Sequence, residues 1–135
     1  MFNLLYIWND WGILILRVFL GFAFLVHGLP KIKDLKQTSQ NFEMMGFKPG
    51  NFFGPSIALL EFFGGIALIL GAFVQTLALL FAIEMLVATF WKIKKGNGFV
   101  GGYEFDLSLL VIALMLLVSG SGPFSIDGYL TNLPF

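Results

Sequence analysis

Four long runs of apolar residues follow one another along the chain, at about residues 11–29, 55–70, 75–91 and 104–118. A helix needs ~20 residues to cross a hydrocarbon core, so the shorter second and fourth runs suggest local thinning of the bilayer. The runs are continuous and do not alternate apolar with polar positions, as the strands of a membrane barrel do. The pattern predicts an all-α fold, a membrane-spanning antiparallel four-helix bundle.

The connections between the runs differ in length and pattern. Only the four residues 71–74 separate the second run from the third, which predicts that these two helices form an antiparallel hairpin. The first loop carries a short amphipathic pattern that predicts an interfacial helix in the headgroup layer, ended by Gly46; the alternative is a loop without fixed structure. Its expected apolar face consists of Ile32, Leu35, Ser39, Phe42 and Met45. After the fourth run, Ser125 is expected to cap a further short helix.

Composition limits the class of protein. Hydrophobic residues make up 58% of the 135 residues and charged residues 12%, too apolar for a soluble globule or a disordered chain of this size. The absence of cysteine excludes disulfides and thiol chemistry by this chain, and the zero net charge gives no support for a nucleic-acid partner. We therefore expect one domain, residues 1–135, embedded in a lipid bilayer.

Lysines are confined to two of the connections. Four lie in the loop of residues 30–54 and three in the loop of residues 92–103, whereas the N-terminal segment, the middle loop and the tail have no lysine or arginine. The positive-inside rule then predicts that both basic loops are cytoplasmic and both termini outside, in the inner cell membrane. The first run lacks a basic leader and a cleavage site, so it is expected to remain as a membrane helix.

Several ionisable residues lie in or beside the apolar runs, where an unpaired charge is costly, so they are expected to pair or to line a polar pocket. These candidates are Arg17, His27, Glu61, Glu84, Glu104 and Asp106. Small residues share their helix faces, and such residues allow close helix packing. The expected packing glycines are Gly21, Gly28, Gly64, Gly65 and Gly71. The helix face that carries Arg17 and the one that carries Glu61, each lined by these glycines, should both face the bundle interior.

Each candidate also has a simpler interpretation. Arg17 could extend to the outer headgroups, and Glu61 could serve as a structural ion pair or a protonated, hydrogen-bonded carboxyl group. Glu104 and Asp106 suit the first turn of a helix, where the dipole favours acids. His27, the one histidine, and the carboxylates lack metal-ligand spacing, so no metal site is predicted, and no catalytic residue is assigned.

Taken in order, the motifs resemble the DoxX family of four-helix membrane proteins over nearly the whole chain. They are Arg17-x3-Gly21-x2-Phe24-x2-His27-Gly28-x2-Lys31, Glu61-x2-Gly64-Gly65-x5-Gly71, Gly101-Gly102-Tyr103-Glu104-Phe105 and Gly122-Pro123-Phe124-Ser125-Ile126-Asp127. Carried over from the family, Arg17, His27, Glu61 and Glu104 match its recurrent polar positions. Two departures are Asp106, where an apolar residue is usual, and Gln75, in a turn that is often basic.

The resemblance implies a link to redox physiology. Some members resemble the small membrane subunit of a thiosulfate:quinone oxidoreductase, others are described as partners in thiol or oxidative-stress systems, and the wider superfamily includes cargo-receptor and chaperone-like proteins. The leading hypothesis is a redox-associated subunit without an intrinsic cofactor, whose polar pocket holds a quinone head group beside a partner oxidoreductase or in a homo-oligomer. The alternatives are a non-catalytic scaffold or chaperone-like protein and a small-solute carrier.

Overall fold

The computed structural model describes residues 3–132, and within this range every regular element is helical. In chain order they are α1 (Asn3–Tyr6), α2 (Asn9–Lys33), α3 (Leu35–Met44), α4 (Gly50–Leu70), α5 (Val74–Lys94), η1 (Phe99–Tyr103), α6 (Glu104–Ser119) and α7 (Ile126–Thr131). The element η1 is a wide turn, because Val100 and Gly101 leave helical dihedral angles. The all-α prediction is confirmed.

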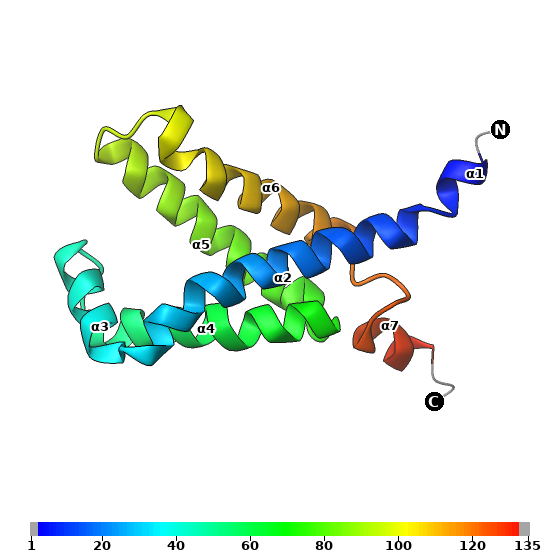
Figure 1. The fold of residues 1–135 in the computed structure, drawn as a ribbon, viewed down its shortest axis with the longest axis horizontal. Helices are drawn as coiled ribbons and strands as arrows, with labels where there is room; N and C mark the ends of the chain where they lie inside the picture. Colours follow the sequence, from blue (N-terminus) through cyan, green and yellow to red (C-terminus); the bar gives the residue numbers. More distant parts are fainter. Residues whose placement is uncertain (1–2, 133–135) are drawn as a thin grey trace.

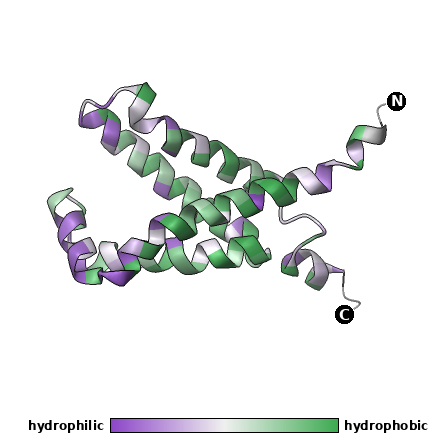
Figure 2. Cartoon of the chain, in the orientation of Figure 1, coloured by the Kyte–Doolittle hydropathy of each residue, from purple (hydrophilic) through white to green (hydrophobic). Residues whose placement is uncertain are grey.

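Four segments are long and apolar enough to cross a membrane: Asn9–Lys33, Gly50–Leu70, Val74–Lys94 and Phe99–Ser119. The prediction of a short second span is wrong, since α4 has 21 residues. Extended Pro49 (φ −76°, ψ 133°) precedes the helix, and its carbonyl accepts hydrogen bonds from Phe52 and Phe53 in the first turn. Hydrophilic residues gather mainly toward the helix ends (Figure 2).

Helices α2 and α4 form a closely packed pair along most of their length. A Cβ atom added at Gly21 would lie 2.7 Å from the carbonyl oxygen of Gly65, and one added at Gly28 would lie 2.6 Å from the backbone nitrogen of Phe62. The two backbones are therefore in direct contact, as small residues permit in membrane helices. These glycines set the separation of the pair.

Helices α5 and α6 form the second pair. Their buried residues include Ala78, Phe81, Leu109 and Ala113. The two pairs meet where Phe24 of α2 stacks on Phe81 of α5, with ring centroids 3.7 Å apart and an interplanar angle of 11°. Figure 1 shows the pairs crossing near the middle of the molecule and diverging toward one end.

The turn between α4 and α5 is tight, as its sequence predicts, but the two helices do not pack as a hairpin. Gly71 and Phe73 have positive φ angles of 79° and 54°, which reverse the chain direction. Beyond the turn, Gly64 faces Phe81 and Leu77 of α5, and the helices share few other contacts. The prediction that α4 and α5 pack against each other as a hairpin is thus wrong, because α4 packs mainly on α2 and α5 mainly on α6.

The helix predicted in the first loop is present as α3. Asp34 caps it by accepting a hydrogen bond from the Gln37 amide, and Gly46, with φ 93°, follows its end. Buried Thr38 lies at the contact with α4, where Gly50 and Gly54 allow close approach. Its position in the headgroup layer stays a prediction.

Both long connections lie at one end of the molecule and both termini lie at the other (Figure 1). The first end, which we call the basic end, carries the connections from α2 to α4 and from α5 to α6, with all seven lysines of the chain. The second, which we call the opposite end, carries the α4–α5 turn and α7. Ser125 caps α7, as predicted, by accepting a hydrogen bond from the Gly128 amide.

Candidate functional site

A bidentate ion pair joins α2 to α4 near the basic end. Lys31 Nζ lies 2.5 Å and 2.6 Å from the two carboxylate oxygens of Glu61. The Glu61 side chain is only 3% exposed, whereas that of Lys31 is 32% exposed. The long lysine side chain therefore extends from the end of its helix to an acid inside the bundle. This contact neutralises a charge that would otherwise be costly in hydrocarbon.

A second ion pair joins α5 to α6 in the same way. Lys92, in the last turn of α5, places Nζ 2.5 Å from Oδ2 of Asp106, in the first turn of α6. Asp106 is buried, whereas Lys92 is partly exposed. In each helix pair, then, a lysine at the end of the first helix binds an acid of the second.

Glu84 lies between these two ion pairs. Its side chain is within hydrogen-bond range of the Glu61 side chain and close to Lys31 and Asp106. Its Oε2 atom is buried and accepts no hydrogen bond from the described residues. We call Lys31, Glu61, Glu84, Lys92 and Asp106 the central cluster. With two cations and three carboxyl groups, it carries one net negative charge when all five are ionised. The arrangement can accept one proton, or a hydrogen-bond donor, at Glu84.

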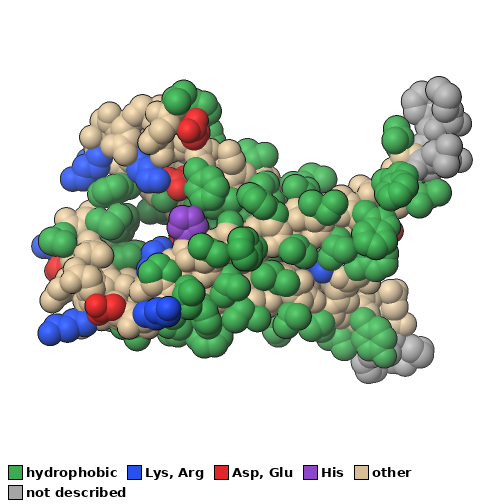
Figure 3. Space-filling view, viewed as in Figure 1, with side chains coloured by type: hydrophobic (Ala, Val, Ile, Leu, Met, Phe, Trp, Pro, Cys, Tyr) green, Lys and Arg blue, Asp and Glu red, His purple; other side chains and the backbone are tan. Residues whose placement is uncertain are grey.

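Two further candidates lie at the border of this cluster. His27 is exposed, and its ring centroid lies 5.7 Å from that of Phe105 on α6. Glu104 is partly exposed, and its Oε1 accepts a hydrogen bond of 2.9 Å from the Gly101 amide, at the start of the helix. Figure 3 shows the molecule hollowed between the two helix pairs here, with the histidine and charged side chains around the opening.

Arg17 does not belong to this site, which corrects the prediction of one pocket containing all the candidates. It lies ten residues before His27 on α2, which is ~15 Å along a helix. The side chain is 2% exposed, so the interpretation that it extends to the headgroups is also wrong. Its guanidinium donates to the carbonyl oxygens of Ser121 and Phe124, at 2.5 Å and 2.6 Å.

These contacts form part of what we call the tail clasp, made of Arg17, Gly71, Ser121, Phe124 and Asp127. The Asp127 carboxylate accepts hydrogen bonds from the Phe73 and Val74 amides at 2.9 Å and 2.8 Å, at the start of α5. The Asp127 amide donates to the Gly71 carbonyl oxygen at 2.9 Å. The clasp thus fixes the segment after α6 onto α2 and onto the α4–α5 turn.

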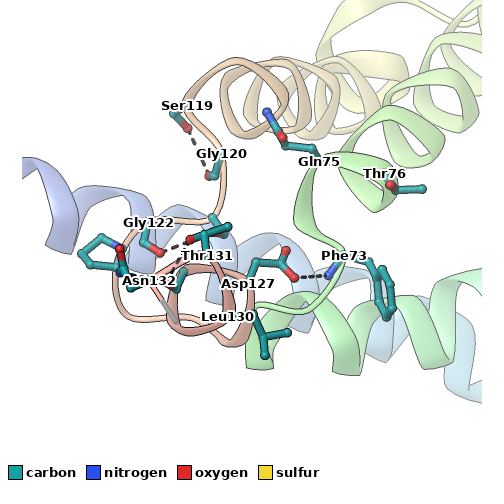
Figure 4. A pocket seen from close by; sticks show the side chains of 13 residues that line it. Phe73, Gln75, Thr76, Ser119, Gly120, Gly122, Asp127, Leu130, Thr131 and Asn132 are labelled. Atoms are coloured by element: carbon teal, nitrogen blue, oxygen red, sulfur yellow. Dashed lines mark hydrogen bonds between the residues drawn. The ribbon is translucent and has the colours of Figure 1, made fainter. Parts of the chain in front are cut away.

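A cavity of about 670 Å³ adjoins the tail clasp at the opposite end. Figure 4 shows it between the start of α5, the end of α6 and α7, with Asp127 directed to Phe73. Asp127 is its one charged lining residue, and that carboxylate already binds two amides. The cavity therefore offers hydroxyl and amide groups without the acid–base pairing of the central cluster.

The glycines occupy three kinds of position. Gly21, Gly28 and Gly65 lie at the α2–α4 contact, Gly64 faces α5, and Gly71 lies in the turn.

Among residues 3–132, no three side chains of His, Cys, Asp or Glu are placed to hold a metal ion. Gln75, at the unusual turn position, donates a hydrogen bond to the Leu117 carbonyl oxygen.

Sequence reasoning did not include Lys31, Lys92 or Asp127 in a site. The two lysines were counted with the loop charges that set orientation, although each ends a helix that leads back to a buried acid. A search for one cation per intramembrane acid could have found them. Asp127 gave no comparable signal, because its partners are backbone amides more than 50 positions away in the chain.

Comparisons with known proteins agree on one family. The family model named DoxX matches residues 12–92. The chain is 33% identical over 118 residues to the candidate oxidoreductase CatD of Bacillus subtilis, covering 87% of this chain and 86% of the relative. It is 34% identical over 127 residues to the inner membrane protein YqjF of Escherichia coli, covering 92% and 95%. An uncharacterised membrane protein of Mycobacterium tuberculosis is 28% identical over 134 residues, covering 90% and 82%. No solved structure matches the chain significantly.

Proposed function

The chain belongs to the DoxX family of membrane proteins, and on that premise we propose that it is a redox-associated subunit whose central cluster holds a quinone head group for a partner oxidoreductase. The observation that carries the proposal is Glu84, which has no cation paired with it, lies within hydrogen-bond range of Glu61 and has a buried Oε2 atom that accepts no hydrogen bond from the described residues. A buried polar atom without a hydrogen bond costs about 1–3 kcal/mol, so an atom of this kind indicates a proton or ligand that completes it.

The residues of the cluster fit a quinone head group. Carbonyl and hydroxyl oxygens need hydrogen-bond partners of both kinds, and the cluster combines ammonium donors at Lys31 and Lys92 with a carboxyl group at Glu84. When bound, a quinone supplies chemistry that takes up two electrons and two protons. Glu84 would hold a proton at Oε2 and exchange it, while His27 at the border would donate a hydrogen bond or pass the proton on.

The electrons are assigned to a partner protein. The sequence has no cysteine and no motif for a flavin or haem. The oxidoreductase name of the Bacillus relative supports the redox association. We place the protein in the inner cell membrane, in keeping with the name of the Escherichia relative. The distribution of lysines favours cytoplasmic loops 30–54 and 92–103 with both termini outside.

A non-catalytic scaffold is the second candidate function. Lys31–Glu61 and Lys92–Asp106 each join two helices of the same pair, as expected of charges that only fix helix pairing. On this view Glu84 is a tolerated acid. A small-solute carrier would instead transport a molecule through liposomes containing this protein alone.

Gentle detergent extraction followed by mass spectrometry separates these functions. The redox proposal expects stoichiometric quinone in the purified protein, and loss of most of it in Glu84→Gln with folding preserved. Glu104→Gln is the matched control, because it makes the same chemical change at the same end while its amide oxygen can still accept from Gly101. Quinone that is absent from the natural protein, or equally retained by both variants, would refute the proposal in favour of the scaffold.

The orientation has its own test. A reporter enzyme that is active only outside the cytoplasm, fused after residue 135, is expected to be active, and one inserted after Asn97 is expected to be inactive. The reverse pattern would contradict the proposed topology.

A further inference from the structure

The opening beside the central cluster faces the side of the molecule. In Figure 3 the four spans cross the view from the basic end to the opposite end, as in Figure 1, and the opening lies between the helix pairs within that length. A direction at right angles to the spans lies in the plane of a bilayer. The opening therefore faces sideways, toward the basic end of the spans (Figure 3).

Protein contacts bridge the two helix pairs at the basic end. Trp91 of α5 donates a hydrogen bond of 3.1 Å from Nε1 to the Met45 carbonyl oxygen, so the two helix pairs touch beyond the cluster. The connection that carries Met45 is itself held, because Glu43 accepts a hydrogen bond from the Gly50 amide and α3 packs on α4. These contacts join the two pairs at this end, where the side chains of Lys31 and Lys92 remain 32% and 31% exposed.

Two rings form part of the border of the opening. Phe105 is 43% exposed and faces the ring of His27, so an apolar ring and an imidazole flank the entrance. The central cluster contains the carboxyl group of Glu84, whose Oε2 atom is buried. An apolar border around a polar interior suits a ligand whose head group is polar and whose remainder is not.

We propose that the central cluster is loaded sideways from the bilayer, through the opening between the helix pairs, by an amphiphile with a compact hydrogen-bonding head and a long apolar tail. One part of this inference rests on the proposed function, namely the identity of the head group as a quinone. The tail remains among the acyl chains, out of contact with water, while the head exchanges its hydrogen bonds for those of the cluster.

Site-directed spin labelling in nanodiscs tests the direction of the opening, since the cysteine-free chain takes a nitroxide only at an introduced cysteine. Phe105→Cys reports on the border, Phe22→Cys on an exposed position within α2, and Lys95→Cys on an exposed position beyond the end of α5. We expect oxygen to relax the labels at 105 and 22 several-fold more than a water-soluble nickel chelate does. A label at 105 as accessible to nickel as the label at 95 would overturn the proposal.

The ligand is tested with two probes, decylubiquinone and its tail-less counterpart ubiquinone-0, compared at equal mole fractions in the bilayer. Sideways loading predicts that only the tailed probe lowers oxygen access at 105, leaving the label at 22 unchanged. An equal effect from the tail-less probe would contradict loading from the bilayer. If neither probe acts while oxygen access at 105 stays high, the quinone assignment fails but the sideways opening stands.

Discussion

Glu61 and Glu84 are acids of neighbouring spans with different surroundings. Glu61 receives two contacts from Lys31, so its charge is compensated within the α2–α4 pair. Glu84 has no ion-pair partner among the described residues and lies within hydrogen-bond range of Glu61, so the two carboxyl groups can share one proton. Under the proposed function, the first acid is structural and the second exchanges a proton.

Removal of Lys31 should be more harmful than removal of the whole ion pair. Lys31→Met leaves Glu61 buried without its cation, and we expect a loss of about 2–3 kcal/mol, below the 3–5 kcal/mol of fully buried pairs because the lysine is partly exposed. The double variant Lys31→Met/Glu61→Leu should recover most of this loss. Denaturation in mixed micelles measures both.

Lys33→Met serves as the control for this experiment, because Lys33 is exposed on the same helix and should change stability by less than about 0.5 kcal/mol. Losses that simply add in the double variant would show that the two residues do not act as a pair.

The sequence predicts acids in the bundle interior, but it does not predict which residues pair with them. An acid in an apolar run must be compensated, which identifies Glu61 and Glu84 without coordinates. Their cations could not be assigned, because Lys31 and Glu61 are 30 positions apart and their pairing depends on the packing of α2 against α4. Arg17 was misplaced for the same reason, since its partners are backbone carbonyls of the distant tail.

At the scale of the elements, glycine positions decide which helices pair. Gly21 and Gly65 bring the α2 and α4 backbones together, whereas α5 is left to pack on α6. Sequence identified the four helices because their apolar runs are long. It could not identify the pairing, since a four-residue turn constrains only where two helices meet and not how far they stay together.

Gly21→Ala should weaken the α2–α4 contact. The new Cβ would lie 2.7 Å from a backbone oxygen that has little freedom to move, and overpacking of this kind typically costs about 1–3 kcal/mol. The matched control is Gly12→Ala in the same helix, where nothing lies within 4 Å of the added atom. The control should be neutral or stabilising by up to ~1 kcal/mol, from helix propensity alone.

Thermal unfolding in detergent compares the two variants. Equal melting temperatures for the alanines at 12 and 21 would mean that the helices are not in backbone contact.

At the scale of the whole molecule, the two helix pairs are held differently at their two ends. The tail clasp joins α2, the α4–α5 turn and α7 at the opposite end through Arg17 and Asp127. At the basic end the Trp91–Met45 hydrogen bond joins the pairs, and the central cluster lies between them. The fold thus fixes one end and leaves polar groups beside an opening near the other.

Asp127→Ala should loosen the clasp without disturbing the cluster. Loss of the carboxylate leaves the Phe73 and Val74 amides without their acceptor, and loss of a helix-capping side chain costs about 0.5–2 kcal/mol. Hydrogen exchange should quicken in residues 71–76 and 121–131, while the exchange of residues 82–92 stays as in the natural protein. Faster exchange in residues 82–92, or unchanged exchange in residues 121–131, would contradict the separation of the clasp from the cluster.

The central claim is that Glu84 exchanges a proton with a ligand bound between the helix pairs. Infrared difference spectroscopy of the protein in nanodiscs, recorded between the oxidised and reduced states of added quinone, observes carboxyl groups directly. The account predicts a carboxyl C=O band that changes with quinone reduction, that disappears in Glu84→Gln and that persists in Glu104→Gln. A difference spectrum without such a band, or one that is unaffected by Glu84→Gln, would contradict it.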